Sequence, residues 1–380
     1  MTRPIDASSS SADTFGAIKQ TLTEAHHLPG AVYTSDEFWR REKEQLFLTE
    51  WLMVCREEEL PAPGDYLTLR IMGEPVLLAR DKDRRILALA NVCRHRGVEV
   101  AMGRGNAELF ICPYHAWTYE LDGRLKSAPY LGDGRRHPTD CNLRQFPIAL
   151  WRGSVFVNLS DTPRDFAAFI APFEEEFGFL QLENCRLARK VEFDMGCNWK
   201  LSLENLLDIY HVGTVHARTF GGQYKGDKDN FRFKLLADGG VSFFEDAAPL
   251  TSDGKSLTGR MPWLANRRDS FAAIGLLWPN LRLSTRIDYV RLWNIWPIAP
   301  GRTKMVANML FPAVAFEQPN FAAKLDEYER FLRTAIEEDR TMIESLQQGV
   351  ASRNFLPGPL ARLEEAIHHF LNHYADRVSA

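Results

Sequence analysis

Two short clusters of metal-binding residues constrain this chain more than any other feature of its sequence. One residue separates Cys93 from His95, two separate Cys112 from His115, and 16 residues lie between the clusters. Two Cys and two His in this order fit a [2Fe–2S] cluster in which imidazoles replace two thiolates on one iron. A tetrahedral zinc site is the alternative, because zinc accepts the same ligands. Zinc ribbons usually carry Cys-x-x-Cys pairs, so the one-residue spacing favours the iron–sulfur cluster.

Composition excludes several classes of protein. Of 380 residues, 45% are apolar and 25% charged, and the formal charge is −4, as in a soluble globular protein with a sizeable core. The sequence lacks the basic excess of a nucleic-acid-binding chain and any apolar run of about 18 residues that could span a membrane. No secretory signal is visible at the N-terminus, and six Cys do not suggest a disulfide framework. We therefore expect a cytoplasmic protein.

Local patterns divide the chain into parts of different character. From Leu60 to Val157, short β-like runs alternate with turn signals, and Asp122-Gly123 is a strong hairpin signal. Beyond this region strands and helices mix, with long helical patterns late in the chain. We predict an α+β protein with an N-terminal segment (1–45) that packs on the C-terminal domain, an all-β metal-binding domain (46–160) and a C-terminal domain of mixed strands and helices (161–380).

A second pair of histidines lies in the downstream half. His211 and His216 are five residues apart, and residues at this spacing point about 140° apart on an ideal helix. A straight helix could not direct both imidazoles at one ion, so we expect the helix to loosen near Gly213. Two His with one carboxylate would form the facial triad of non-haem Fe(II) oxygenases. Two His alone are also compatible with partly buried structural residues.

The motifs resemble those of known families. Residues Cys93, His95, Gly97, Cys112, Pro113, His115 and Trp117 resemble Rieske iron–sulfur domains. The segment 198–216, of the form Asn-Trp-Lys…Glu-Asn…Asp-x-Tyr-His-x4-His, resembles the iron-binding segment of the large subunits of Rieske non-haem iron oxygenases. The resemblance runs from about Tyr33 to the C-terminus. It implies an all-β Rieske domain followed by a helix-grip-like catalytic domain, an antiparallel sheet covered by helices.

The same resemblance points to the remaining iron ligand. Similar oxygenases take it from the Asp of a Glu-Asp pair on a late helix, and Glu338-Asp339 fits this pattern. We assign the role to Asp339, with Glu338 or Glu344 as alternatives. Adjacent carboxylates on a helix otherwise form a solvated face.

Asp208 precedes His211 by three residues, so the two side chains are neighbours on a helix. In the family this carboxylate links an iron-ligating His to a cluster-ligating His of the next subunit. The resemblance therefore implies that Asp208 bridges His211 and His115 across an interface, although a plain helix-face Asp is the simpler possibility. Passing electrons to a neighbour requires a closed head-to-tail ring, and we expect a homotrimer.

These assignments describe a terminal oxygenase that uses O2 and electrons from NAD(P)H through a separate reductase or ferredoxin. No Gly-x-Gly-x-x-Gly fingerprint for a nucleotide cofactor is visible in the chain itself. We expect hydroxylation of a small organic substrate, including N- or O-dealkylation, with arene cis-dihydroxylation in aromatic hydrocarbon catabolism still open. A Rieske electron-transfer protein and a zinc-stabilised binding module are the competing classes.

The substrate is the least constrained part of the prediction. Pocket walls should come from the iron-binding helix and the central strands, and the candidate residues are Leu206, Leu207, Val212, Trp278, Asn280, Arg291 and Trp293. An aromatic wall with an Arg could hold an aromatic acid, whereas an aromatic wall alone could hold an alkylammonium group. Each of these aromatic residues could also be ordinary core.

Overall fold

The computed structural model describes residues 14–130, 140–219 and 232–379. The chain divides into two compact units, Phe47–Phe166 and a second unit that joins Met1–Leu46 to Ala167–Ala380. Within the described ranges, no helix is both long and apolar enough to cross a membrane.

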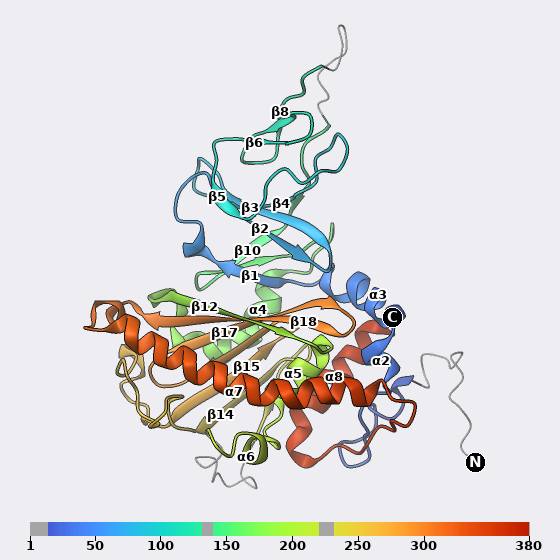
Figure 1. The fold of residues 1–380 in the computed structure, drawn as a ribbon, viewed down its shortest axis with the longest axis vertical. Helices are drawn as coiled ribbons and strands as arrows, with labels where there is room; N and C mark the ends of the chain where they lie inside the picture. The colour runs from blue at the N-terminus through green and yellow to red at the C-terminus, as the bar shows by residue number, and fades with distance from the viewer. Residues whose placement is uncertain (1–13, 131–139, 220–231, 380) are drawn as a thin grey trace. The chain divides into compact units, whose positions relative to one another are not determined.

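The unit Phe47–Phe166 is built from antiparallel strands (Figure 1). One sheet runs in the order β5 (Arg104–Asn106), β2 (Asp65–Ile71), β3 (Glu74–Arg80), β4 (Ile86–Ala90), β9 (Gln145–Phe146). A second runs β1 (Leu52–Arg56), β11 (Ser154–Val157), β10 (Ile148–Trp151), and a third β6 (Phe110–Ile111), β7 (Thr118–Tyr119), β8 (Leu125–Ser127). Asp122-Gly123 lies in the connection between the paired strands β7 and β8, which confirms the predicted hairpin. Gly123 has a φ of +85°, a conformation that suits glycine.

One apolar core of this unit contains residues of both Cys/His clusters. The side chains of Cys93 and Cys112 belong to it, together with those of Trp117 and Tyr119. Strands β3 and β4 supply Leu77, Ala79 and Leu89 to the same core. The metal-binding loops are therefore held by packed side chains.

The other unit is centred on one antiparallel sheet. Its strands run in the order β12 (Cys185–Met195), β18 (Arg302–Pro312), β17 (Val290–Ala299), β16 (Leu281–Thr285), β15 (Phe271–Leu277), β14 (Val241–Asp246), β13 (Lys234–Leu235). The helices are α2 (Ala31–Thr34), α3 (Asp36–Glu42), α4 (Phe166–Phe177), α5 (Trp199–Leu207), α6 (Val212–Val215), α7 (Phe321–Val350), α8 (Glu365–Val378). One unit is an antiparallel sheet covered by helices and the other is built from strands, which confirms the predicted α+β class.

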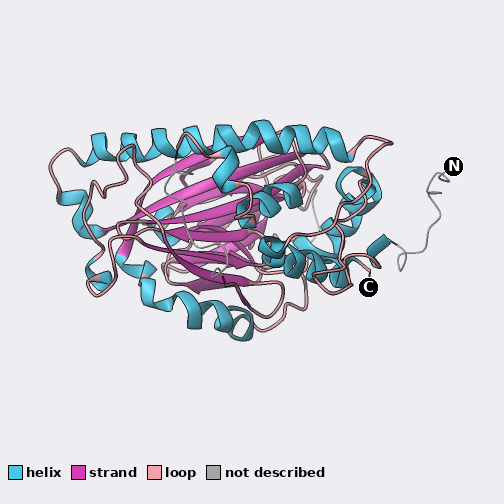
Figure 2. Ribbon diagram, turned by 90° about the horizontal axis from the view of Figure 1, so that it is seen from below, coloured by secondary structure: helices cyan, strands magenta, loops and turns pink. Residues whose placement is uncertain are grey.

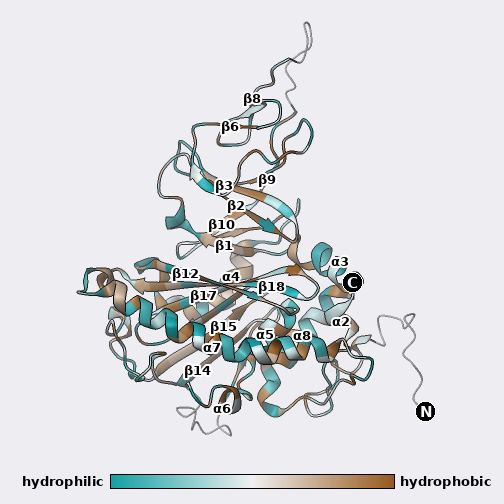
Figure 3. Cartoon of the chain, in the orientation of Figure 1, coloured by the Kyte–Doolittle hydropathy of each residue, from teal (hydrophilic) through white to brown (hydrophobic). Residues whose placement is uncertain are grey.

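Helix α7 lies along the sheet (Figure 2) and has one apolar face. Its buried residues recur every three or four positions, as Leu325, Tyr328, Leu332, Ile336, Asp339 and Ile343 show. Teal and brown segments alternate along this helix in Figure 3 for the same reason. Asp339 is the one acidic residue on that buried face, so the packing of α7 directs its carboxylate into the interior of the unit.

Helix α5 ends before the first of the two histidines, His211. Its last residue is Leu207, and Asp208 takes an extended backbone conformation with φ −75° and ψ 117°. The Asp208 carboxylate accepts a hydrogen bond from the backbone N–H of Tyr210, which satisfies a donor that no longer belongs to a helix. The predicted loosening therefore occurs before Gly213, and α6 begins anew at Val212.

The buried carboxylate of Glu42, on helix α3, connects that helix to α5 and α8. Glu42 is 1% exposed and accepts hydrogen bonds from Trp199 Nε1 and Tyr374 OH, both at 2.8 Å. It also pairs with Lys200, whose side chain is fully buried. Burial lowers the pKa of Lys200, and the charge of Glu42 opposes that shift. Because protein surrounds the pair, each buried charge is stabilised mainly by the opposite charge of its partner.

We predict that Glu42→Ala strongly destabilises this unit. Removing one partner of a buried ion pair leaves the other charge uncompensated, at a cost of about 3–5 kcal/mol. Calorimetric melting of the holoenzyme checks this against Glu37→Ala, which removes an exposed glutamate from the same helix. Equal melting temperatures for the two variants would contradict the prediction.

Candidate metal centres

The Cys and His clusters of the all-β unit lie on two facing turns. Cys93 and His95 follow β4, and the Gly97 N–H donates to the Cys93 carbonyl. Cys112 and His115 lie between β6 and β7, where the Ala116 N–H donates to the Cys112 carbonyl. The rings of His95 and His115 come within 4.5 Å of each other, centroid to centroid. Residues that are distant in sequence therefore converge as two ligand pairs.

The sulfur and nitrogen ligands differ in exposure. Cys93 and Cys112 are each 2% exposed, whereas His95 is exposed and His115 is half-buried. Desolvation and the nearby His95 and Arg96 lower the pKa of His115, which favours the neutral imidazole that a metal requires. Buried thiols with outward imidazoles suit an iron–sulfur cluster that exchanges electrons at the surface through its histidine side.

Two aromatic residues support these ligands. The indole of Trp117 stacks on His95, with ring centroids 5.0 Å apart and planes 9° from parallel. The Tyr119 hydroxyl accepts the backbone N–H of Arg94 at 3.0 Å and lies 3.3 Å from Cys93 Sγ. Burial and the neighbouring Cys93 raise the pKa of Tyr119, so its proton is available for the sulfur.

We predict that Tyr119→Phe lowers the reduction potential of the cluster. Hydrogen bonds to the sulfurs raise such potentials, and a net bond energy of about 0.5–1.5 kcal/mol corresponds to roughly 20–60 mV for one electron. Redox titration followed by visible absorption measures the change. Tyr114→Phe is the matched control, because the hydroxyl of Tyr114 contacts Arg96 and no sulfur. An unchanged potential in Tyr119→Phe would show that this hydroxyl does not tune the cluster.

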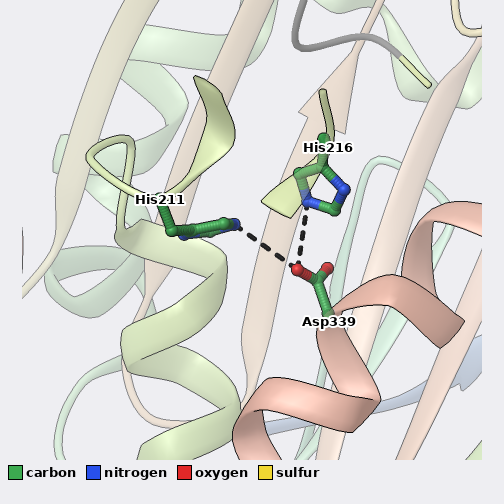
Figure 4. A group of neighbouring side chains, drawn as sticks. All are labelled: His211, His216 and Asp339. Carbon is green, nitrogen blue, oxygen red and sulfur yellow. Dashed lines mark ion pairs between the residues drawn. The ribbon is translucent and has the colours of Figure 1, made fainter. Parts of the chain in front are cut away.

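The second centre brings together His211, His216 and Asp339 (Figure 4). Asp339 Oδ1 lies 3.4 Å from His211 Nε2 and 3.0 Å from His216 Nε2. The three ligand atoms all lie within 4.8 Å of one another, yet Asp339 Oδ1 is buried without a well-aligned hydrogen bond. Atoms that bind one ion at about 2.0–2.2 Å have similar mutual separations. This donor set fits a mononuclear iron.

A second carboxylate holds each histidine of this group. Asp208 Oδ2 lies 3.0 Å from His211 Nδ1, and Glu338 Oε2 lies 2.8 Å from His216 Nδ1. Carboxylates at Nδ1 fix the tautomer and leave Nε2 free to bind a metal. Glu338 was an alternative ligand in the sequence interpretation, but its oxygen faces the outer nitrogen of His216.

The two histidines and Asp339 of the second centre shift one another's pKa values toward the charged forms. Burial alone would lower the pKa of His211, but the hydrogen bond with Asp208 and the nearby Asp339 carboxylate raise it to about 9. Burial likewise opposes the ionisation of Asp339, but the two imidazoles lower the pKa of its carboxyl group. Asp339 therefore presents a carboxylate anion, the form that binds a divalent metal.

Helix α7 is fixed to the start of α5 by two polar side chains. Glu344 Oε1 accepts the backbone N–H of Gly196 at 2.9 Å, and Gln347 Oε1 accepts that of Asn198 at 2.7 Å. Glu344, the other alternative ligand, is thus engaged elsewhere. These bonds set the position of α7 along α5 and thereby place Asp339 opposite the two histidines.

A cavity of about 690 Å³, its open mouth included, lies beside this group. Four of the predicted pocket residues line it, namely Leu206, Val212, Arg291 and Trp293. Leu207, Trp278 and Asn280 do not line it and are buried elsewhere. Leu207 follows Leu206 on α5 and so faces another direction, while the Trp278 ring packs on Trp199 and Phe370.

Sequence reasoning missed several residues of the cavity wall. On the strands and their ends they include Phe243, Glu245, Ile274, Arg282, Ser284 and Arg286. Two of them could have been found from strand alternation, because Arg282 and Ser284 lie opposite Trp293 and Arg291 in the β16–β17 pair. The others required knowledge of the sheet order.

Comparisons with known proteins identify the families to which the two parts of the chain are similar. Residues 50–147 match the Rieske [2Fe-2S] domain, and residues 182–380 match the ring hydroxylating alpha subunit (catalytic domain). The glycine betaine monooxygenase oxygenase subunit of Pseudomonas aeruginosa is 26% identical over 92% of this chain and 89% of its own length. The anthranilate 1,2-dioxygenase large subunit of Acinetobacter baylyi is 30% identical over 73% of this chain and 67% of its own length.

A solved structure shows the same fold. The quaternary ammonium Rieske monooxygenase in complex with L-carnitine superposes with a TM-score of 0.76 and 22% identity, over 92% of this chain and 96% of that one. The chain belongs to the family of Rieske oxygenase catalytic (alpha) subunits. It is an oxidoreductase of a family that carries a Rieske [2Fe–2S] cluster and a mononuclear iron, and that uses O2 with electrons from a reductase.

Proposed function

We propose that this chain hydroxylates a small aromatic or amine substrate by monooxygenation, at an iron held by His211, His216 and Asp339. The observation that carries the proposal is the convergence of these three ligand atoms beside a largely apolar cavity. Ligands on one side of an ion leave its other side open toward that cavity. Cys93, His95, Cys112 and His115 are assigned to the [2Fe–2S] cluster.

Side chains of this protein orient the proposed iron ligands and limit the access of water to the site. Asp208 and Glu338 hold the two imidazoles by Nδ1. Leu206, Val212 and Ile336 line the cavity with hydrocarbon, which limits the access of water. When bound, the cluster supplies single electrons and the iron(II) supplies the activation of O2.

Relatives of this chain are named for two types of oxygenation. One relative is named as a glycine betaine monooxygenase and another as an anthranilate dioxygenase, so both reactions occur among similar proteins. We favour monooxygenation, which includes dealkylation next to N or O, over arene dihydroxylation and a role in aromatic hydrocarbon catabolism. Both reactions consume O2, two electrons and two protons, but monooxygenation releases one oxygen atom as water.

Electrons would come from NAD(P)H through a separate reductase or ferredoxin. We further propose a cytoplasmic homotrimer in which Asp208 connects His211 to His115 of a neighbouring subunit. The cysteines form no disulfide among the described residues, which is compatible with a reducing compartment. The domain limits proposed here are 1–45, 46–160 and 161–380. In support, Met1–Leu46 forms one unit with Ala167–Ala380.

Turnover under ¹⁸O₂ tests this function. The purified holoenzyme, supplied with NADH and a surrogate reductase, is screened against aromatic acids, alkylamines and aryl ethers. One labelled oxygen in the first-formed product is expected, or one in the aldehyde that dealkylation releases, provided carbonyl exchange with water is controlled. Two labelled atoms in a diol would establish dioxygenation, and NADH oxidation without any oxygenated product would reject the oxygenase.

A further inference from the structure

Positive charge is concentrated on one wall of the active-site cavity. Arg282 and Arg286 come from β16 and its C-terminal end, and Arg291 comes from β17. In the strand pairing Arg282 faces Trp293, and Ser284 faces Arg291. These four side chains therefore share one face of the sheet, and the two guanidinium groups on it lie diagonally across the strand pair.

Arg286 already has partners within the protein. Its Nε donates to the Ala248 carbonyl at 3.2 Å and its Nη1 to the Thr285 carbonyl at 3.0 Å. Its Nη2 lies 3.6 Å from Glu245 Oε1, the carboxylate on the same side of the cavity. Arg286 and Glu245 thus compensate each other.

Arg282 and Arg291 are in a different situation. They are 8% and 7% exposed, and Arg282 Nε is buried without a hydrogen-bond acceptor. Within the described residues, the guanidinium of Arg291 meets aromatic faces instead of a carboxylate, at 5.6 Å from the ring of Tyr289 and 5.9 Å from that of Trp293. Neither cation has a close anionic partner in the part of the chain that the structure describes.

Such an arrangement is costly for the protein alone. Burial lowers the pKa of Arg282, and the neighbouring Arg291 and Arg286 lower it further, whereas Glu245 and Asp339 oppose the shift. An arginine nevertheless remains charged near neutral pH. Buried cations without partners are unfavourable unless a ligand supplies the opposite charge, and guanidinium groups match the planar geometry of oxyanions.

We propose that the cavity binds a small organic anion, with a carboxylate or sulfonate group held by Arg282 and Arg291. Phe243 and Ile274 of the same wall would contact its apolar part. This assignment rests on the proposed function, because it names the substrate class of the same site. A cation without an acid group is disfavoured by the charge of the wall, whereas a zwitterion can still bind through its acid.

Binding measured by calorimetry tests the assignment in the anaerobic holoenzyme. Anthranilate is compared with the neutral 2-aminobenzamide, and glycine betaine with the cationic choline. Benzenesulfonate against benzenesulfonamide separates sulfonate from carboxylate. We expect the acid of at least one pair to bind about tenfold or more tightly than its counterpart. Arg282→Gln and Arg291→Gln should each remove most of that preference, and Arg302→Gln, an exposed arginine paired with Asp194, should retain it.

Two results would overturn the assignment. One is equal or tighter binding of the neutral or cationic member in every pair that binds, and the other is an acid preference that survives both substitutions. If no probe binds, the thermal stability of a variant tests the site without any substrate. Arg282→Met should melt at or above the wild-type temperature because it removes an uncompensated charge, and a melting temperature several degrees lower would reject the site.

The anion site and the oxygenase can fail independently. If the enzyme oxidises choline-like cations and neither binds nor oxidises acids, the oxygenase proposal stands and the anion site is rejected. If acids bind in a way that depends on the two arginines, but no substrate gives an oxygenated product, the anion site stands and the oxygenase proposal is rejected.

Discussion

His211→Ala is expected to abolish substrate oxidation while the visible spectrum of the [2Fe–2S] cluster stays unchanged. The imidazole supplies one of the three ligand atoms that converge at Asp339, and two remaining ligands hold a divalent ion far more weakly. Loss of a residue that merely orients a ligand already costs about 10–100-fold in metal affinity or activity. Product formation should therefore fall by more than about a hundredfold.

Metal analysis distinguishes this outcome from general damage. The iron content of His211→Ala should fall by the mononuclear ion alone, because the cluster ligands belong to the other unit of the chain. His26→Ala is the matched control, since the only hydrogen bond of its ring among the described residues is with the backbone carbonyl of Glu24. Retained turnover in His211→Ala would reject the iron site.

Much of the fold and site was predictable because the chemistry requires particular residues at particular spacings. Cys93 and His95 define a ligand pair whatever strands surround them, and His211 with His216 requires a break in the helix. The position of that break was less predictable. It depends on Asp208 accepting the Tyr210 N–H, a local bond that competes with the helix and that spacing alone does not show.

The cavity wall shows where sequence reasoning stops. Strand β15 is a continuous apolar run, and periodicity cannot separate such a strand from a buried helix. Without β15 in place, Ile274 and Phe243 could not be assigned to the wall. Arg282 was missed for a related reason, because a charged residue in a buried strand becomes meaningful only when its cross-strand neighbours are known.

Asp208→Ala is expected to leave both metal groups bound and yet nearly stop product formation in a single turnover. Asp208 holds His211 by Nδ1 and is 18% exposed at its side chain, so one carboxylate can touch both this ligand and a neighbouring subunit. In the proposed trimer it is the link to His115 of that subunit. Its loss should slow the substrate-dependent reoxidation of a pre-reduced cluster by about a hundredfold or more, the upper end of effects at such supporting residues.

Glu338→Gln separates electron transfer from support of the ligand. Glu338 is hydrogen-bonded to His216 as Asp208 is to His211, so both substitutions weaken the support of an imidazole that is proposed to bind iron. Only Asp208 is proposed to contact a neighbouring subunit. With iron occupancy matched by metal analysis, Glu338→Gln should reoxidise its cluster at close to the wild-type rate, and Asp208→Ala should not. Equal rates in the two variants would mean that Asp208 serves only to orient His211. A slow Asp208→Ala with full iron occupancy, beside a normal Glu338→Gln, would support electron transfer through the Asp208 carboxylate.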